Sequence, residues 1–258
     1  MQDNNNSIHQ FDYSLICEYF ASLHRQGPGS DTATLRALSF LPVQAAGTQI
    51  IDIGCGTGAS TMVLAHATNA HITAVDLFED FLTMLNHKAT AAGIDHRVTA
   101  QKADMNELPF ADESFDVVWS EGAIYNVGFQ RGISLWRRLI KPDGYLVVSE
   151  ATWSTVTRPQ EIQLFWEEAY PEIDLVSAKV KHLEEAGYQV IATFQLPYSA
   201  WEDFYRPAQA AQQHFLESHP ENAIALELVA NQRHEAEIFG KYHQYYGYTF
   251  FVAKKVGL

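Results

Sequence analysis

The chain has 258 residues, of which 47% are hydrophobic and 19% are charged, and its formal net charge of −14 argues against a nucleic-acid partner, because binding to phosphates depends on lysine and arginine. No apolar run approaches the ~20 residues of a membrane span, and residues 1–10 lack the pattern of a signal peptide, so we expect a cytoplasmic protein. The two cysteines, Cys17 and Cys55, are too few for a disulfide framework or a cysteine-based zinc site.

The first part of the chain predicts two helices. The sequence RQGPGS at 25–30 separates them, since glycine and proline interrupt helices. On either side of this break, apolar residues recur at helical spacing, at Ile16, Tyr19, Phe20 and Leu23 and then at Leu35, Leu38 and Leu41. We therefore expect residues 1–47 to form a helical cap.

From residue 48 onward, predicted strands and helices alternate. The strands fall at 49–54, 71–76, 97–103, 115–120 and 145–150. A helical stripe over 77–92 ends at Gly93, and another runs through Ile133, Trp136, Leu139 and Ile140 into the turn KPDG. Alternation of this kind predicts an α/β fold in which helices cover both faces of a mostly parallel sheet.

Beyond residue 150 the alternation becomes less regular. One helix is expected between Pro159 and Pro171, and another ends at Gly187. Two further strands are predicted at 188–196 and 247–256. Residues 201–240 have a helical pattern and contain no predicted strand, and no linker cuts off a separate domain. We therefore treat 48–258 as one domain that carries a helical insertion at about 201–240.

The sequence IIDIGCGTGAS at 50–60 is an apolar run that breaks into three glycines and then returns to small residues. A strand, a tight glycine turn and a helix start present backbone N–H groups to a nucleotide-bearing ligand. The spacing of Gly54, Gly56 and Ala59 also satisfies the dinucleotide fingerprint. The motif alone therefore leaves open which adenosine-bearing ligand the turn holds.

In their order, the motifs of the chain resemble those of the class I S-adenosylmethionine-dependent methyltransferases, in particular the small-molecule (type 11) group that includes the ubiquinone and menaquinone methyltransferases. The resemblance rests on IIDIGCGTG, on Asp76 at the end of the second strand, and on KADMNELPF and SFDVVWSEGAIYN at the third and fourth. LIKPDGYLVVSE, LEEAGYQV and the final aromatic strand extend it. It implies a Rossmann-like, doubly wound sheet of seven strands with the last strand antiparallel, and S-adenosylmethionine as cofactor.

The resemblance also implies a set of cofactor-binding residues. Glycines let the main chain approach a ligand closely, and Asp76 could accept both hydroxyls of a ribose or cap the following helix. Asp104 and Met105 match positions that contact adenine, and Asp52 matches the acidic residue near the methionine ammonium group. The full predicted set is Asp52, Gly54, Cys55, Gly56, Thr57, Gly58, Asp76, Leu77, Asp104, Met105 and Glu121.

Catalytic residues leave little trace in such a sequence, because methyl transfer from a sulfonium needs alignment and exclusion of water more than it needs an acid. The segment SEGAIYN at 120–126 matches the part of the family that faces the methyl group. Glu121 and Tyr125 are the candidate catalytic residues, with a structural carboxylate and a loop anchor as their alternative roles. The histidines show no metal-ligand spacing, so we expect no metal.

Three functions stay open at this point. The first is transfer of a methyl group to a small molecule, and the aromatic residues Trp201, Phe204 and Tyr205 favour an apolar or aromatic acceptor. The second is an NAD(P)-dependent oxidoreductase, although no tyrosine is followed by lysine four residues later, as in short-chain reductases. The third is a non-catalytic or protein-directed cofactor-binding protein. In each case we expect a monomer or a homodimer.

Overall fold

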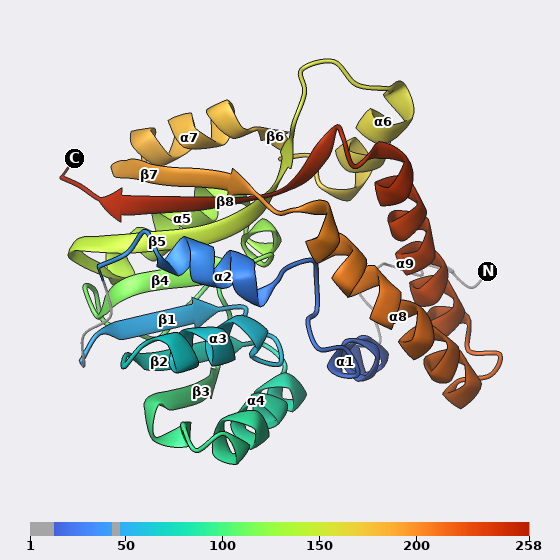
Figure 1. Cartoon of the computed structure of the whole chain (residues 1–258), viewed down its shortest axis with the longest axis horizontal. Helices are drawn as coiled ribbons and strands as arrows, with labels where there is room; N and C mark the ends of the chain where they lie inside the picture. Colours follow the sequence, from blue (N-terminus) through green and yellow to red (C-terminus); the bar gives the residue numbers. More distant parts are fainter. Residues whose placement is uncertain (1–12, 43–46, 258) are drawn as a thin grey trace, which may run out of the picture.

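The computed structural model describes residues 13–42 and 47–257, and a twisted sheet forms its centre (Figure 1). Seven strands lie in the order β3-β2-β1-β4-β5-β8-β7, and β8 is antiparallel to both of its neighbours. The strands are β1 (Gln49–Ile53), β2 (His71–Asp76), β3 (Val98–Lys102), β4 (Phe115–Glu121), β5 (Ile140–Trp153), β7 (Tyr188–Gln195) and β8 (Tyr246–Lys255). The two-residue strand β6 (Asp174–Leu175) pairs with the end of β5. The predicted seven-stranded, mostly parallel sheet is confirmed.

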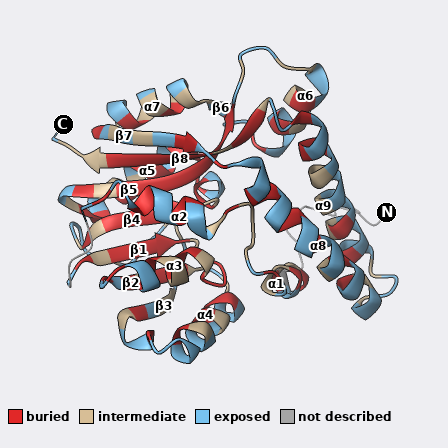
Figure 2. Cartoon of the chain, viewed as in Figure 1, coloured by how far each residue is buried: buried red, intermediate tan, exposed pale blue. Residues whose placement is uncertain are grey.

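The central strands are apolar on both faces, because helices cover both sides of the sheet. Successive residues Ile50 and Ile51 are both fully buried but belong to separate core clusters. The first cluster lies under α2 (Asp31–Leu38), α3 (Ala59–Ala67) and α4 (Glu79–Ala91), and the second lies under α5 (Phe129–Trp136) and α7 (Val176–Glu185). Figure 2 shows buried residues running along the middle strands and exposed residues on the outer sides of these helices. Two-sided burial is the reason why the strands read as continuous apolar runs.

One predicted helix extends too far. The prediction carried the helix through Leu139 and Ile140, but α5 ends at Trp136 and a single 3-10 turn covers Arg137–Leu139. Ile140 instead begins β5 and pairs with Phe115 of β4. The side chain of Arg138, in this turn, donates to the carbonyl oxygen of Leu108 at 2.7 Å. A helical apolar spacing and a short buried strand look alike at this position.

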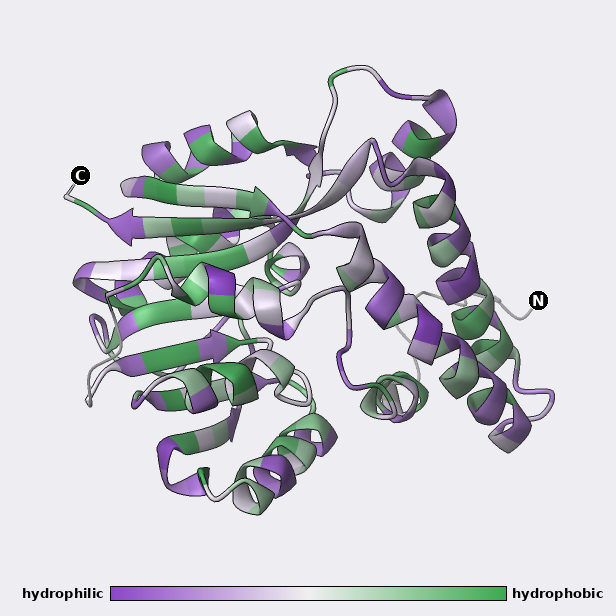
Figure 3. Cartoon of the chain, in the orientation of Figure 1, coloured by the Kyte–Doolittle hydropathy of each residue, from purple (hydrophilic) through white to green (hydrophobic). Residues whose placement is uncertain are grey.

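Three helices stand beyond the carboxyl ends of the parallel strands (Figure 1). They are α1 (Tyr13–Ala21), α8 (Tyr198–Ser218) and α9 (Ala223–Tyr242), and each of them contacts the other two. The pair α8 and α9 connects β7 to β8, where the sequence predicts the helical insertion, and α6 (Gln160–Ala169) follows β5. Figure 3 shows that α8 and α9 alternate hydrophilic and hydrophobic residues along their length, as expected of helices that pack on one side only.

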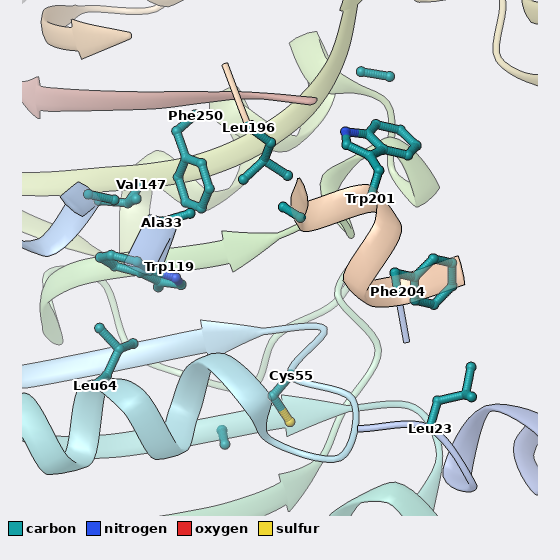
Figure 4. Packing of buried hydrophobic residues seen from close by; sticks show 14 of the residues in the cluster. Leu23, Ala33, Cys55, Leu64, Trp119, Val147, Leu196, Trp201, Phe204 and Phe250 are labelled. Atoms are coloured by element: carbon teal, nitrogen blue, oxygen red, sulfur yellow. The ribbon is translucent and has the colours of Figure 1, made fainter. Parts of the chain in front are cut away.

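The helices at this end share a core with the sheet. Leu23, which follows α1, and Trp201 and Phe204 of α8 belong to the same cluster as Trp119 of β4 (Figure 4). The ring of Trp201 stacks on that of Phe239 from α9, with 4.2 Å between the ring centroids. Residues far apart in the chain therefore close over the ends of β1 and β4, where the predicted site lies.

Candidate functional site

The turn that follows β1 brings its backbone close to the segment after β4. Gly54, Gly56 and Gly58 all have a positive φ, between 55° and 86°. A Cβ atom placed on Gly54 would lie 2.5 Å from the Cβ of Ala123, a distance that real Cβ atoms essentially never show. Position 54 therefore requires glycine, both because its φ is positive and because the segment around Ala123 approaches it closely.

Asp76, the last residue of β2, binds this turn with its carboxylate. One oxygen accepts a hydrogen bond from the backbone N–H of Gly56 at 2.9 Å, and the other accepts one from Phe78 at 3.0 Å. Burial raises the pKa of Asp76, against the lowering effect of these hydrogen bonds. A carboxylate has about four acceptor positions, so both oxygens can still accept from a ligand. The adjacent Leu77 is 50% exposed and free to cover an apolar group.

Asp52 lies inside the protein beneath the same turn. One of its oxygens accepts hydrogen bonds from the hydroxyls of Ser60 at 2.8 Å and Thr61 at 2.7 Å. The other oxygen is buried and has no hydrogen-bond partner in the described part of the chain. Burial raises the pKa of Asp52 from its ordinary value to about 7. A donor brought by a ligand would therefore find a buried acceptor there.

We expect the substitution Asp52→Asn to change the pH dependence of stability. The raised pKa means that the folded protein keeps a proton which the unfolded chain releases above about pH 4. The stabilisation by Asp52 is therefore complete below that pH and is lost as the pH rises towards 7. Urea unfolding measures the free energy of unfolding of the variant and of the parent at pH 4.5 and at pH 8. From the lower to the higher pH, the difference between the two proteins should shift in favour of the variant by about 2–4 kcal/mol. An equal difference at both pH values would show that Asp52 is ionised in the folded protein.

The segment after β3 holds the two residues assigned to adenine. The carboxylate of the exposed Asp104 accepts from the backbone N–H of Asn106 at 2.8 Å and from its side-chain amide at 2.9 Å. The terminal methyl of Met105 lies 3.3 Å from the position of a Cβ on Gly54. Trp136 anchors this segment, because its indole N–H donates to the carbonyl oxygen of Met105 at 2.9 Å. Met105 therefore borders the glycine turn, and the adjacent Asp104 is exposed to solvent.

Glu121, at the end of β4, is held by the N-terminal part of the chain. One carboxylate oxygen accepts from the hydroxyl of Thr34 at 2.7 Å and from the indole N–H of Trp119 at 2.9 Å. The other oxygen lies 3.4 Å from the guanidinium of Arg25. Burial raises the pKa of Glu121, and the charge of Arg25 opposes this effect. The arrangement ties α2 and the 22–30 segment to the end of β4.

Two residues of the site were missed by sequence reasoning. The side-chain oxygen of Gln26 accepts from the backbone N–H of Thr57 at 2.9 Å, and its amide donates to the hydroxyl of Thr57 at 3.2 Å. Lys88 of α4 donates to the carbonyl oxygen of Thr57 at 2.9 Å. Gln26 lies within the RQGPGS break at 25–30. Its place in this predicted connection is the one feature of the sequence that points to a role at the site.

Tyr125 and Cys55 have different surroundings. Tyr125 is 43% exposed, its ring lies 6.1 Å from that of Tyr170, and no hydrogen bond in the described ranges joins it to Glu121. The thiol of Cys55 is buried, and burial raises its pKa, so it serves as a small apolar group. Among residues 13–42 and 47–257, no group of three or more His, Cys, Asp or Glu side chains could hold a metal ion.

Comparison with known proteins identifies the central part of this structure. Residues 51–148 match a family model described as a methyltransferase domain. This block resembles a methyltransferase domain. It includes the glycine turn, Asp76, Asp104 and Glu121, and the resemblance noted in the sequence is thereby confirmed.

Curated relatives match part of the chain, and solved structures match most of it. The 27-O-demethylrifamycin SV methyltransferase of Amycolatopsis mediterranei is 33% identical over 45% of this chain and 43% of its own. The demethylmenaquinone methyltransferase of Clavibacter sepedonicus is 39% identical over 46% of this chain and 45% of its own. The matched regions thus span less than half the length of these relatives. A Geobacter sulfurreducens methyltransferase, solved with S-adenosylhomocysteine, has the same fold over 93% of this chain and 97% of its own, with a TM-score of 0.82 and 19% identity.

None of the helices in the described ranges is long and apolar enough to cross a membrane.

Proposed function

We propose that this protein is an S-adenosylmethionine-dependent methyltransferase that acts on a small-molecule acceptor. The observation that carries the proposal is the contact between Asp76 and the glycine turn, which aligns a carboxylate with a backbone cradle at the carboxyl ends of β1 and β2. Ligands of open α/β sheets bind outside the carboxyl ends of the strands, at the point where the strand order reverses, which here lies between β1 and β4. The match of residues 51–148 and the named activities of the relatives support it.

The residues of the site fit this cofactor. The buried, unpartnered oxygen of Asp52 suits an ammonium group, and the remaining acceptor positions of Asp76 suit the two hydroxyls of a ribose. Met105 and Leu77 offer apolar surface for a purine ring, beside the carboxylate of Asp104. When bound, S-adenosylmethionine supplies a methyl group on a positively charged sulfur.

The chain contributes alignment and exclusion of water. Trp201 and Phe204 of α8 cover the ends of the strands with apolar surface, and a dry site strengthens the electrostatic contacts inside it. Glu121 is bound by Arg25, Thr34 and Trp119. We propose that it holds the N-terminal helices in position and forms one wall of the cofactor site. Tyr125, which keeps an exposed ring, is the proposed contact to the acceptor. We further propose that the acceptor has an apolar or aromatic portion and that the protein acts as a monomer or homodimer.

Calorimetry distinguishes this function from a nicotinamide oxidoreductase. S-Adenosylhomocysteine should bind to the protein with a dissociation constant in the micromolar range, and NADH should give no heat of binding. Tight binding of NADH without a response to S-adenosylhomocysteine would contradict the proposal. Incubation with methyl-labelled S-adenosylmethionine and a pool of metabolites then tests turnover. Label recovered in a small molecule supports the proposal, and label found only in protein or only in unreacted cofactor contradicts it.

We expect binding of S-adenosylhomocysteine to close the cap over the site. Arg25 and Gln26 connect the 22–30 segment to Glu121 and Thr57, so a ligand at the glycine turn should stabilise that segment and the helices packed on it. Hydrogen exchange measures this directly, because lids belong to the less stable parts of a structure. Protection should increase in 22–38 and in 198–242 as well as at 50–60. An increase confined to 50–60, Asp76 and Asp104 would mean that the cap is fixed.

A further inference from the structure

Glu235 of α9 is an inward-facing carboxylate without a cationic partner. It accepts a hydrogen bond from the hydroxyl of Tyr205 at 3.1 Å, and none of the ion pairs within the described residues includes it. Burial raises the pKa of Glu235. The nearest basic residues along α9 contact other groups. Arg233 donates to Gln212 at 3.0 Å, Lys241 pairs with Glu161 at 2.7 Å, and the ring of His234 lies 5.8 Å from that of Phe165.

Aromatic side chains extend from Tyr205, the hydrogen-bond partner of this carboxylate, whose ring lies 6.1 Å from that of Trp201. Trp201 stacks on Tyr248 with 5.2 Å between ring centroids, and its ring meets that of Tyr246 edge to face at 6.0 Å. The hydroxyl of Tyr246 is buried and has no hydrogen-bond partner in the part of the chain that the structure describes. Burial raises the pKa of Tyr246, and the charge of Glu235 nearby raises it further. The cluster therefore combines a carboxylate that has no cationic partner, a hydroxyl that has no hydrogen-bond partner, and several aromatic rings.

The cluster lies beside the proposed site of methyl transfer. The ring of Tyr248 comes within 3.9 Å of the position of a Cβ on Gly122, the residue after Glu121. Tyr248 also pairs with Ala151 near the end of β5. Tyr125 follows Gly122 by three positions in the chain, and its ring is partly exposed. The group formed by Glu235, Tyr205, Tyr246, Tyr248 and Trp201 thus reaches the segment after β4 at Gly122. We call it the Glu235 cluster.

We propose that the Glu235 cluster binds a cationic amine group of the acceptor, an inference that rests on the proposed function. An ammonium group can donate to Glu235 and to the unpartnered hydroxyl of Tyr246, while the ring of Tyr248 attracts its charge. An anionic group would instead face an uncompensated carboxylate in a partly desolvated setting, which is strongly unfavourable. The net charge of −14 also attracts cations to the protein.

The test uses two probes that differ in charge but hardly in shape, 3,3-dimethylbutylamine, which is cationic at pH 7, and neutral 3,3-dimethylbutan-1-ol. Calorimetry or ligand-observed NMR measures both with the full protein, with and without S-adenosylhomocysteine. The amine should bind about tenfold more tightly than the alcohol. Glu235→Gln should remove this preference while keeping an acceptor for Tyr205, and Glu237→Gln, an exposed site on the same helix, should retain it.

Equal affinity for the two probes, absence of amine binding, or an unchanged preference in Glu235→Gln would overturn the inference. Binding of S-adenosylhomocysteine is recorded in the same titrations and separates the two proposals. If the cofactor product binds and the amine preference is missing, only the amine site is wrong. If the cofactor product does not bind, the proposed function itself fails.

Discussion

Replacing Asp76 with alanine should weaken the binding of S-adenosylhomocysteine by about 2–4 kcal/mol, or roughly 30- to 1,000-fold in the dissociation constant. The substitution removes the carboxylate proposed to accept from the ribose hydroxyls, and hydrogen bonds to charged groups are the stronger ones. It also leaves the backbone N–H groups of Gly56 and Phe78 without their acceptor. Calorimetry on the folded variant measures the affinity, and thermal unfolding without ligand measures the separate loss of stability.

The matched control for this result is Asp80→Ala. Asp80 lies in the first turn of α4, is exposed, and carries the same charge without contacting the glycine turn. Its removal should leave the dissociation constant within about twofold, because exposed charges have small effects. A folded Asp76→Ala variant that binds as tightly as the Asp80→Ala control would show that the ribose lies elsewhere.

The second large effect is expected from Gly54→Ala. A Cβ at this position would lie 2.5 Å from the Cβ of Ala123, which cannot rotate away, and the backbone has a φ of 71°. Strain and overpacking together should lower the free energy of unfolding by about 2–4 kcal/mol. The displaced turn should also raise the dissociation constant of S-adenosylhomocysteine at least about tenfold.

Gly93→Ala separates the backbone strain from the clash. Gly93 has a nearly identical φ of 70°, lies after α4, and has no atom within 4 Å of its Cβ position. This variant should lose only about 1–2 kcal/mol and bind S-adenosylhomocysteine normally. If both variants lose the same free energy of unfolding, Ala123 can move away from the new Cβ with little loss of stability. The distance between the two segments would then not be tightly constrained.

The sheet and the glycine turn could be predicted because their signals are local. Buried parallel strands are short apolar runs, and the turn needs glycine within a few residues. Asp76 could be assigned for the same reason, since it closes a strand that the pattern identifies. The alternation of strands and helices then determines which strand ends meet at one edge of the sheet.

The contacts that complete the site depend on packing between distant segments. Gln26 reaches Thr57 across 31 positions of the chain, and Thr34 reaches Glu121 across 87. The periodicity of the sequence does not predict such pairs, because each residue is compatible with its own helix or connection whether or not the other is present. The same holds for the helix predicted through Ile140, where pairing with Phe115 outweighs the local spacing.

The position of β8 between β5 and β7 has a consequence for the order of folding. In the described structure β7 is antiparallel to β8 and joins the sheet only through it, yet a fifty-residue segment that includes α8 and α9 separates the two strands in the chain. Until both helices have formed and β8 has docked on β5, β7 is an unpaired strand, and its sequence YQVIATFQ contains no charged residue to deter pairing with another chain. Long-range closure of this kind is slow. Intermediates that lack β8 should therefore be the species most prone to aggregate.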